Sequence, residues 1–152
     1  MKRIIFTAQT GNCREAMAAA ILRDLMPDGG IEILARGLVV LFPEPMNQKA
    51  EAVLIANGLQ VRDFVSRPLT REDITEDTMV FTMEEKHKKR VLEQFPDVRE
   101  DQVEVLPYFV GDELETVDPY GGQLANYGLC LESLKLMLKK LVSWLEEQTE
   151  TE

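Results

Sequence analysis

The chain has 152 residues, of which 45% are hydrophobic and 29% are charged, a composition typical of one folded domain rather than of a disordered or fibrous chain. Its formal net charge of −10 leaves no basic face that could neutralise phosphates, so we expect neither nucleic acid nor an anionic membrane as a partner. The two cysteines, Cys13 and Cys130, lie far apart, and the chain shows neither a signal peptide nor an apolar run of membrane-spanning length. These features predict a cytoplasmic chain without a disulfide bond.

The single histidine, His87, excludes a His-rich metal site, and we expect neither a metal ion nor another cofactor. It lies in a short basic run, residues 86–90, that follows two glutamates on a predicted helix. Nothing near it in the sequence resembles a partner nucleophile. We therefore expect an exposed histidine on a solvated helix face.

The first structural signal is a strand, a tight loop and a helix. Residues 3–7 form a β-branched and aromatic run, residues 8–12 are small and polar, and residues 13–26 carry an apolar stripe at helical spacing. Such a loop can direct several backbone N–H groups and a helix N-terminus towards one point, which is a binding arrangement for a phosphate-like anion. Arg14 could add a bidentate contact. The alternative is a turn that binds nothing, as in many α/β domains.

The remaining elements alternate between strands and helices. Thr70 followed by Asp73 is a variant of the capping signature and predicts the start of a short helix. The other expected strands cover residues 31–35, 78–83 and 103–106, and the other expected helices cover residues 46–57, 84–95 and 123–147.

Four strands separated by helices predict an α/β fold: a four-stranded parallel sheet with helices on both faces, similar to a Rossmann fold. In such sheets ligands bind at the carboxyl ends of the strands, where the first loop lies. No repeat or linker divides the chain. We expect a single domain over residues 1–148 and an acidic tail over residues 149–152.

The last predicted helix has leucines at alternating steps of three and four, including Leu124, Leu131 and Leu138, which is also the pattern of a coiled coil. Met137 and Trp144 widen this stripe. A broad apolar face favours packing on the sheet over a narrow dimer seam. We therefore expect a monomer or a weak dimer.

The residues from Phe6 to Ala18, Phe-Thr-Ala-Gln-Thr-Gly-Asn-Cys-Arg-Glu-Ala-Met-Ala, support a more specific hypothesis. They resemble the signature of the low-molecular-weight protein tyrosine phosphatases, Cys-x-Gly-Asn-x-Cys-Arg-Ser followed by Pro-Met-Ala. In this register Ala8 occupies the position of the nucleophilic cysteine and Arg14 that of the phosphate-binding arginine. The phosphate-binding loop implied by the resemblance is Ala8, Gln9, Thr10, Gly11, Asn12, Cys13 and Arg14.

A second segment, residues 116–124, contains Asp118-Pro119-Tyr120 followed by two glycines. From composition alone it is a turn before a helix. It also resembles the Asp-Pro-Tyr segment of the same phosphatases. The resemblance implies that Asp118 takes the place of the general acid and that Tyr120 helps to wall the substrate cleft. Because it extends in order over nearly the whole chain, it implies the fold of that family.

Several further positions depart from the family pattern. Thr10 and Gly11 replace the Gly-Asn pair, and Glu15 replaces a serine whose hydroxyl supports the thiolate. Phe64 stands where a supporting histidine is expected. A carboxylate at position 15 would repel a phosphate dianion unless it points away or pairs with Arg14.

These departures, together with Ala8, predict a catalytically inactive relative, a pseudophosphatase, that keeps a loop for a phosphate-like anion or a phosphotyrosine protein. One alternative is an active phosphotyrosine phosphatase, working through a phosphocysteine, whose cysteine was changed to Ala8. Another is an enzyme similar to arsenate reductases, which needs a relay of thiols, whereas this chain has only Cys13 and Cys130. Cys13 matches the second cysteine of the family signature, and we do not expect it to attack phosphorus.

Overall fold

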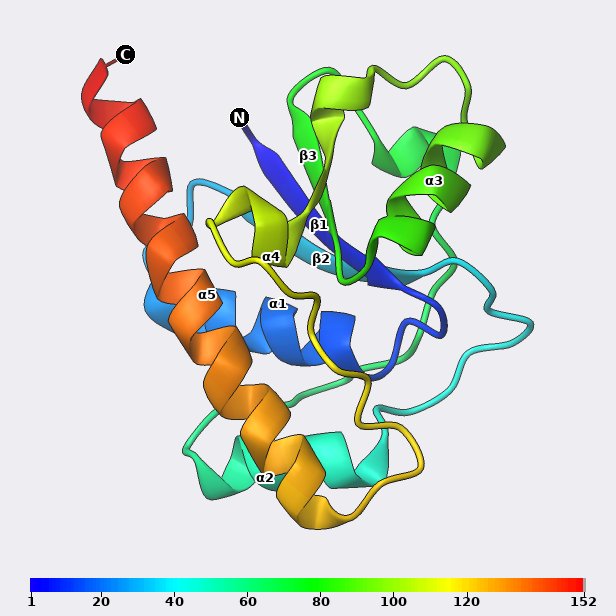
Figure 1. Ribbon diagram of the computed structural model, residues 1–152, viewed down its shortest axis with the longest axis vertical. Coiled ribbons are helices and arrows are strands. Elements are labelled where there is room, and N and C mark those ends of the chain that lie inside the picture. The colour runs from blue at the N-terminus through cyan, green and yellow to red at the C-terminus, as the bar shows by residue number, and fades with distance from the viewer. Residues whose placement is uncertain (152) are drawn as a thin grey trace.

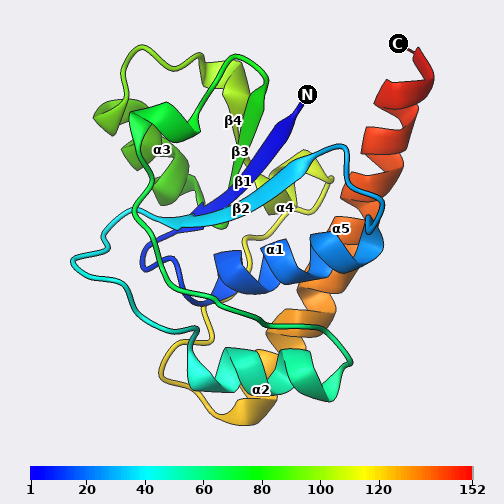
Figure 2. The ribbon, with the colours of Figure 1, turned by 180° about the vertical axis from the view of Figure 1, so that it is seen from behind.

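The computed structural model describes the backbone of residues 1–151 and the side chains of residues 1–149. Its centre is a parallel sheet in which the strands lie in the order β2-β1-β3-β4 (Figures 1 and 2). The strands are β1 (Arg3–Ala8), β2 (Glu32–Gly37), β3 (Thr78–Thr82) and β4 (Val103–Val105). The four-stranded parallel sheet predicted from the sequence is confirmed.

Helices cover both faces of the sheet (Figures 1 and 2). On one side lie α1 (Arg14–Leu25), α2 (Gln48–Ala56) and α5 (Leu124–Thr151), and on the other lies α3 (Glu85–Gln94). The short elements are η1 (Arg71–Asp73), η2 (Glu100–Gln102) and α4 (Leu106–Phe109). The N–H of Thr70 donates to Oδ2 of Asp73 at 2.9 Å, which is the capping contact predicted for η1.

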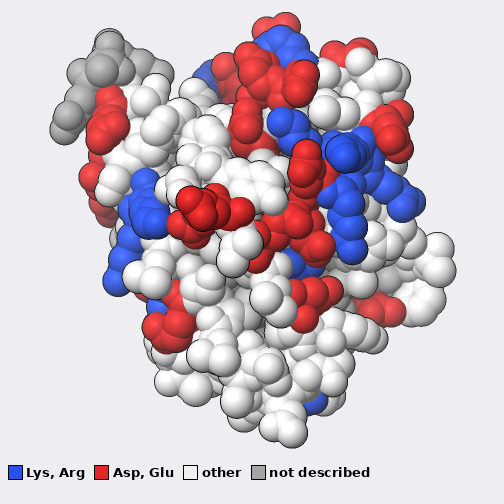
Figure 3. Space-filling view, viewed as in Figure 1, with Lys and Arg blue, Asp and Glu red and all other residues white. Residues whose placement is uncertain are grey.

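The basic helix α3 differs from its prediction at one residue. Lys86, Lys89 and Arg90 are exposed, and Figure 3 shows blue side chains over this helix beside a group of acidic ones. His87, however, is only 2% exposed, and its Nδ1 accepts the N–H of Glu84 at 3.2 Å. The prediction of an exposed histidine was wrong because its position in the first turn directs the ring back towards the helix start.

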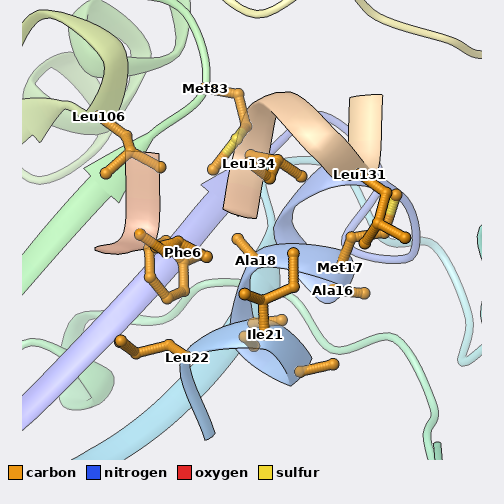
Figure 4. Close-up of a cluster of buried hydrophobic side chains, with 14 of the residues drawn as sticks. Phe6, Ala16, Met17, Ala18, Ile21, Leu22, Met83, Leu106, Leu131 and Leu134 are labelled. Carbon is orange, nitrogen blue, oxygen red and sulfur yellow. The ribbon is translucent and has the colours of Figure 1, made fainter. Parts of the chain in front are cut away.

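The core consists of two clusters, one on each face of the sheet. Successive side chains of β1 point to opposite faces, so Ile4 and Phe6 join the cluster around α1, whereas Ile5 joins the one beneath α3. Figure 4 shows side chains of β1, α1 and α5 pointing into the first cluster. Because β1 is buried on both faces, its carboxyl end is held firmly where the loop begins.

The long helix α5 buries its apolar stripe within the chain. Leu131, Leu134, Leu138 and Leu141 are fully buried. The helix packs mainly against α1 and α2, whereas the sequence led us to expect packing on the sheet. The leucines share one core cluster with Phe6 and Phe81 of the sheet. The helix also continues to Thr151, past the end expected at residue 147. In the described part of the chain, no helix combines the length and apolarity that a membrane crossing requires.

The short helix α4 was not predicted. It follows β4 directly, with Pro107 in its first turn, where a missing N–H removes no helical hydrogen bond. Its Phe109 forms edge-to-face contacts with Phe81 at 5.1 Å and with Trp144 at 4.9 Å between ring centroids. These contacts tie the end of β4 to α5 and fix the start of the segment that carries Asp118.

Candidate functional site

The loop between β1 and α1 lies at the carboxyl end of a central strand. A cavity of about 290 Å³ opens there, and the Asp118 segment closes its other side. The structure therefore brings together the two segments singled out in the sequence. The residues that line the cavity are Ala8, Gln9, Thr10, Cys13, Arg14, Glu15, Asp118 and Tyr120.

Ala8 is the last residue of β1 and is 4% exposed. It lies on the same face of the strand as Phe6, so its methyl group contributes both to the core around α1 and to the cavity. A methyl group has neither a lone pair nor an ionisable proton. The position at the strand end therefore supplies shape to the cavity but no reactive atom.

Backbone contacts with the residues that follow β2 hold the loop in place. The carbonyls of Ala8 and Gln9 accept the N–H groups of Leu38 and Val39, both at 2.9 Å. Gly11 has a φ of +82°, and a Cβ built there would lie 3.0 Å from the nitrogen of Gly37. The loop therefore needs glycine at position 11 both for its backbone conformation and for its close approach to β2.

Arg14 is almost fully buried, with a side-chain exposure of 3%. Its Nη1 donates to the carbonyl of Thr116 at 2.8 Å, and its Nη2 donates to Oε2 of Glu84 at 2.5 Å. Oδ2 of Asp118 lies 3.6 Å from the same Nη2. The guanidinium thus links the start of α1 to the residues that follow β3 and to the Asp118 segment.

The Asp118 segment forms a turn at the mouth of the cavity. Oδ1 of Asp118 accepts the N–H of Tyr120 at 3.0 Å, so the carboxylate shapes its own turn while its second oxygen faces Arg14. The side chain of Asp118 is 52% exposed, and Tyr120 is 73% exposed. Tyr120 borders the cavity and does not seal it.

Glu15 occupies an unexpected place. It is 1% exposed, and it neither points away from the loop nor forms an ion pair with Arg14 in the described structure. Its Oε1 accepts the N–H of Cys13 at 2.8 Å, and its Oε2 accepts the N–H of Gly11 at 3.2 Å. Burial raises the pKa of this carboxyl above its usual value, and the loop N–H groups act in the opposite direction.

Both cysteines are buried free thiols. Burial, reinforced by the negative charges of Glu15 and Asp118, raises the pKa of Cys13 to about 12. Burial likewise raises the pKa of Cys130 to about 11. Since a thiolate is the nucleophilic form, Cys13 is held at neutral pH in its unreactive protonated form.

Glu84 and Thr116 were not predicted as parts of the site. Glu84 lies two residues after the end of β3 and caps α3, so it reaches the same sheet edge as the loop. Its position just after a strand was the signal that could have identified it. Partial burial acts to raise the pKa of Glu84, but the hydrogen bond from Arg14 holds it below its usual value. Phe64, by contrast, is half-buried and packs against the core around α1.

His87 lies behind Glu84. Its Nε2 is 3.7 Å from Oε2 of that carboxylate. Burial lowers the pKa of His87 to about 4, although the charge of Glu84 acts in the opposite direction. Because Nδ1 accepts a backbone N–H, the proton of the neutral ring lies on Nε2, on the side of Glu84.

A larger cavity of about 840 Å³ lies between residues 111–119 and α5 and shares Asp118 with the first. Its floor carries Cys130 and Met137, and its lining includes no arginine, lysine or histidine. The smaller cavity is therefore where the opposite charges and the loop N–H groups converge. Within the described residues, no group of three or more His, Cys, Asp or Glu side chains could hold a metal ion.

Comparison with known proteins identifies the protein family of the chain. The family model described as low molecular weight phosphotyrosine protein phosphatase matches residues 3–151. A protein-arginine-phosphatase of Geobacillus stearothermophilus is 26% identical over 146 residues, which cover 96% of this chain and 97% of that protein. The low molecular weight protein-tyrosine-phosphatase PtpB of Staphylococcus haemolyticus is 25% identical over 139 residues, which cover 91% of this chain and 96% of that protein.

Solved structures agree with this match. The YwlE arginine phosphatase from Geobacillus stearothermophilus superimposes with a TM-score of 0.90 at 30% sequence identity, over 100% of this chain and 98% of that one. A low molecular weight protein tyrosine phosphatase from T. tengcongensis superimposes with a TM-score of 0.87 at 27% identity, over 94% and 99% of the two chains. The chain therefore belongs to the low molecular weight phosphotyrosine protein phosphatase family.

Proposed function

We propose that this chain is a pseudophosphatase: it keeps the scaffold and the loop of its family but does not hydrolyse phosphate esters. One observation carries the proposal. Among the residues that line the cavity, Ala8 at the strand end is inert, and the thiol of Cys13 has its pKa raised to about 12. With no thiolate at the cavity, a phosphocysteine cannot form.

The expected loss of activity is large. Removal of the nucleophile from other enzymes lowers turnover on the order of a million-fold. The test is hydrolysis of phenyl phosphate, a phosphotyrosine peptide and a phosphoarginine peptide, since relatives are named for both kinds of phosphoprotein. We expect rates at the uncatalysed background for all three. Turnover well above background that disappears in Asp118→Asn would overturn the proposal.

The second candidate is an active phosphatase whose cysteine was replaced by Ala8. The retained pair of Asp118 and Arg14, with Oδ2 3.6 Å from Nη2, favours it. It predicts that Ala8→Cys alone restores rapid turnover, with Arg14 and Asp118 essential. The buried carboxylate of Glu15 supports the pseudophosphatase instead, because a thiolate at position 8 would share the cavity with a second negative charge.

Compartment and assembly complete the proposal. Two buried free thiols fit a reducing compartment, and we place the protein in the cytoplasm. In the part of α5 whose side chains are described, Leu131, Leu134 and Leu138 are buried within the chain, which supports a monomer or a weak dimer rather than a stable coiled coil. Light scattering of the purified chain tests this: a stable dimer at micromolar concentration would contradict it.

A further inference from the structure

We propose that the carboxylate of Glu15 is a built-in ligand of the loop: it occupies the N–H groups that would otherwise bind an external oxyanion. The inference rests on the proposed function and states how the same site is regulated. An anion such as phosphate would then bind tightly only when Glu15 is removed or displaced.

The first observation behind this proposal is the hydrogen bonds of Glu15. The two oxygens of Glu15 take one loop N–H each, from Cys13 at 2.8 Å and from Gly11 at 3.2 Å. A phosphate held by a loop at a helix N-terminus uses the same kind of donor. Glu15 is the second residue of α1, so its side chain can fold back onto the loop that precedes its own helix. Two N–H groups of the loop are therefore already occupied by oxygens of the chain itself.

The second observation is the burial of Glu15. Glu15 is 1% exposed, yet it lines the same cavity as Ala8, Arg14 and Asp118. A buried carboxylate that lost the two N–H groups to an incoming phosphate would remain without its hydrogen bonds beside a dianion. An external anion must therefore compete with Glu15 for its donors and also overcome its charge.

The neighbouring charges also disfavour binding of an external anion. Arg14 is the only basic residue among those that line the cavity, and its guanidinium already contacts the carboxylate of Glu84 and lies near that of Asp118. The three acidic groups around one buried arginine give this end of the sheet a negative balance. The site as built favours its own carboxylate over a second, external anion.

Ala8 and Glu15 also complement each other. The small side chain at the strand end leaves space in the cavity that both residues line. A cysteine thiolate at position 8 would place a negative charge in that space with the carboxylate. Ala8 and Glu15, the two departures from the family signature, therefore belong to one arrangement. In it the loop has no nucleophile, and the internal carboxylate takes the place of an external anion.

The experiment compares the full native chain with Glu15→Ser, using inorganic phosphate and sulfate as probes. Calorimetry gives the affinity, and the ¹H–¹⁵N resonances of Gly11 and Cys13 report where the anion binds. The matched control is Glu147→Ser, which removes one exposed carboxylate on α5. We expect Glu15→Ser to bind phosphate about 10- to 100-fold more tightly than the native chain and the control. In the variant, phosphate no longer has to displace the Glu15 carboxylate from the N–H groups of Gly11 and Cys13.

A second measurement applies to the native chain and does not depend on whether the variant folds. A through-hydrogen-bond scalar coupling should connect the N–H of Cys13 to the side-chain carboxyl carbon of Glu15. Absence of that coupling would overturn the inference, as would a folded Glu15→Ser with unchanged phosphate affinity. Phenyl phosphate hydrolysis by the native chain would overturn the proposed function instead, so the two failures can be told apart.

Discussion

The carboxylate of Asp118 faces the guanidinium of Arg14 across the cavity, with Oδ2 3.6 Å from Nη2. The two residues are far apart in the sequence, one at the start of α1 and the other shortly before α5, and they meet because the Asp118 segment crosses the carboxyl edge of the sheet (Figure 1). The pair gives the cavity one carboxylate and one guanidinium. Ala8 and Glu15 line the same cavity; in our proposal Ala8 stands where a sulfur nucleophile is expected, and Glu15 occupies the N–H groups of the anion site.

Restoring the sulfur should not be enough to restore turnover. We expect Ala8→Cys alone to hydrolyse phenyl phosphate no faster than the native chain, because the new thiol shares its cavity with the Glu15 carboxylate. In the double variant, Glu15→Ser also frees two loop N–H groups. We expect the double variant to hydrolyse phenyl phosphate at least on the order of a hundredfold faster than Ala8→Cys alone. Steady-state rates and the pH dependence of iodoacetamide alkylation at position 8 provide the check. Rapid hydrolysis by the single variant would favour an active enzyme that had lost its cysteine.

Removing the carboxylate of Glu84 should destabilise the fold. Glu84→Gln leaves the buried guanidinium of Arg14 without its nearest charge, and breaking a buried or partly buried pair costs about 2–4 kcal/mol. The free energy of unfolding from urea titration measures the effect. Glu93→Gln, an exposed change on the helix that Glu84 caps, is the control and should lie within about 0.5 kcal/mol of the native value. Equal stability of the two variants would show that the pair contributes little.

The buried histidine should make stability depend on pH. His87 has its pKa lowered from 6.5 to about 4 by burial, so the unfolded chain binds the proton more readily than the folded chain. Stability from this group is fully present above pH 6.5 and is lost as the pH falls towards about 4. His87→Gln should flatten this part of the curve of unfolding free energy against pH. An unchanged slope between those values would mean that His87 titrates normally.

The loop glycine should be more sensitive to substitution than a glycine with the same backbone angle elsewhere. Gly11 has φ +82° and Gly58 has φ +77°, but only at Gly11 would a Cβ meet the backbone of Gly37. We expect Gly58→Ala to cost about 1 kcal/mol, and Gly11→Ala about 2–4 kcal/mol, because both strain and a close contact are added. Thermal unfolding of the two variants gives the comparison. Equal costs would mean that the loop can move away from β2.

Much of the site was accessible from local sequence patterns. A β-branched run followed by a small polar loop and an apolar stripe predicts β1, the loop and α1, because backbone preferences and burial act over a few residues. The placement of Asp118 near Arg14 came from the family resemblance, since no local pattern links segments so far apart. The short helix α4 was missed because four residues give too little periodicity to recognise.

The alternating order of strands and helices thus determined the sheet, and the composition of the first loop determined where an anion could lie. Three features were decided only by the packed structure: the Glu15 side chain turns towards the loop, His87 is buried, and Glu84 contacts Arg14. Each of these side chains lies at or beside the start of a helix and can turn either outwards or back towards the sheet. Which way it turns depends on the donors, charges and space that distant segments bring to the same edge, and these exist only after the chain has folded.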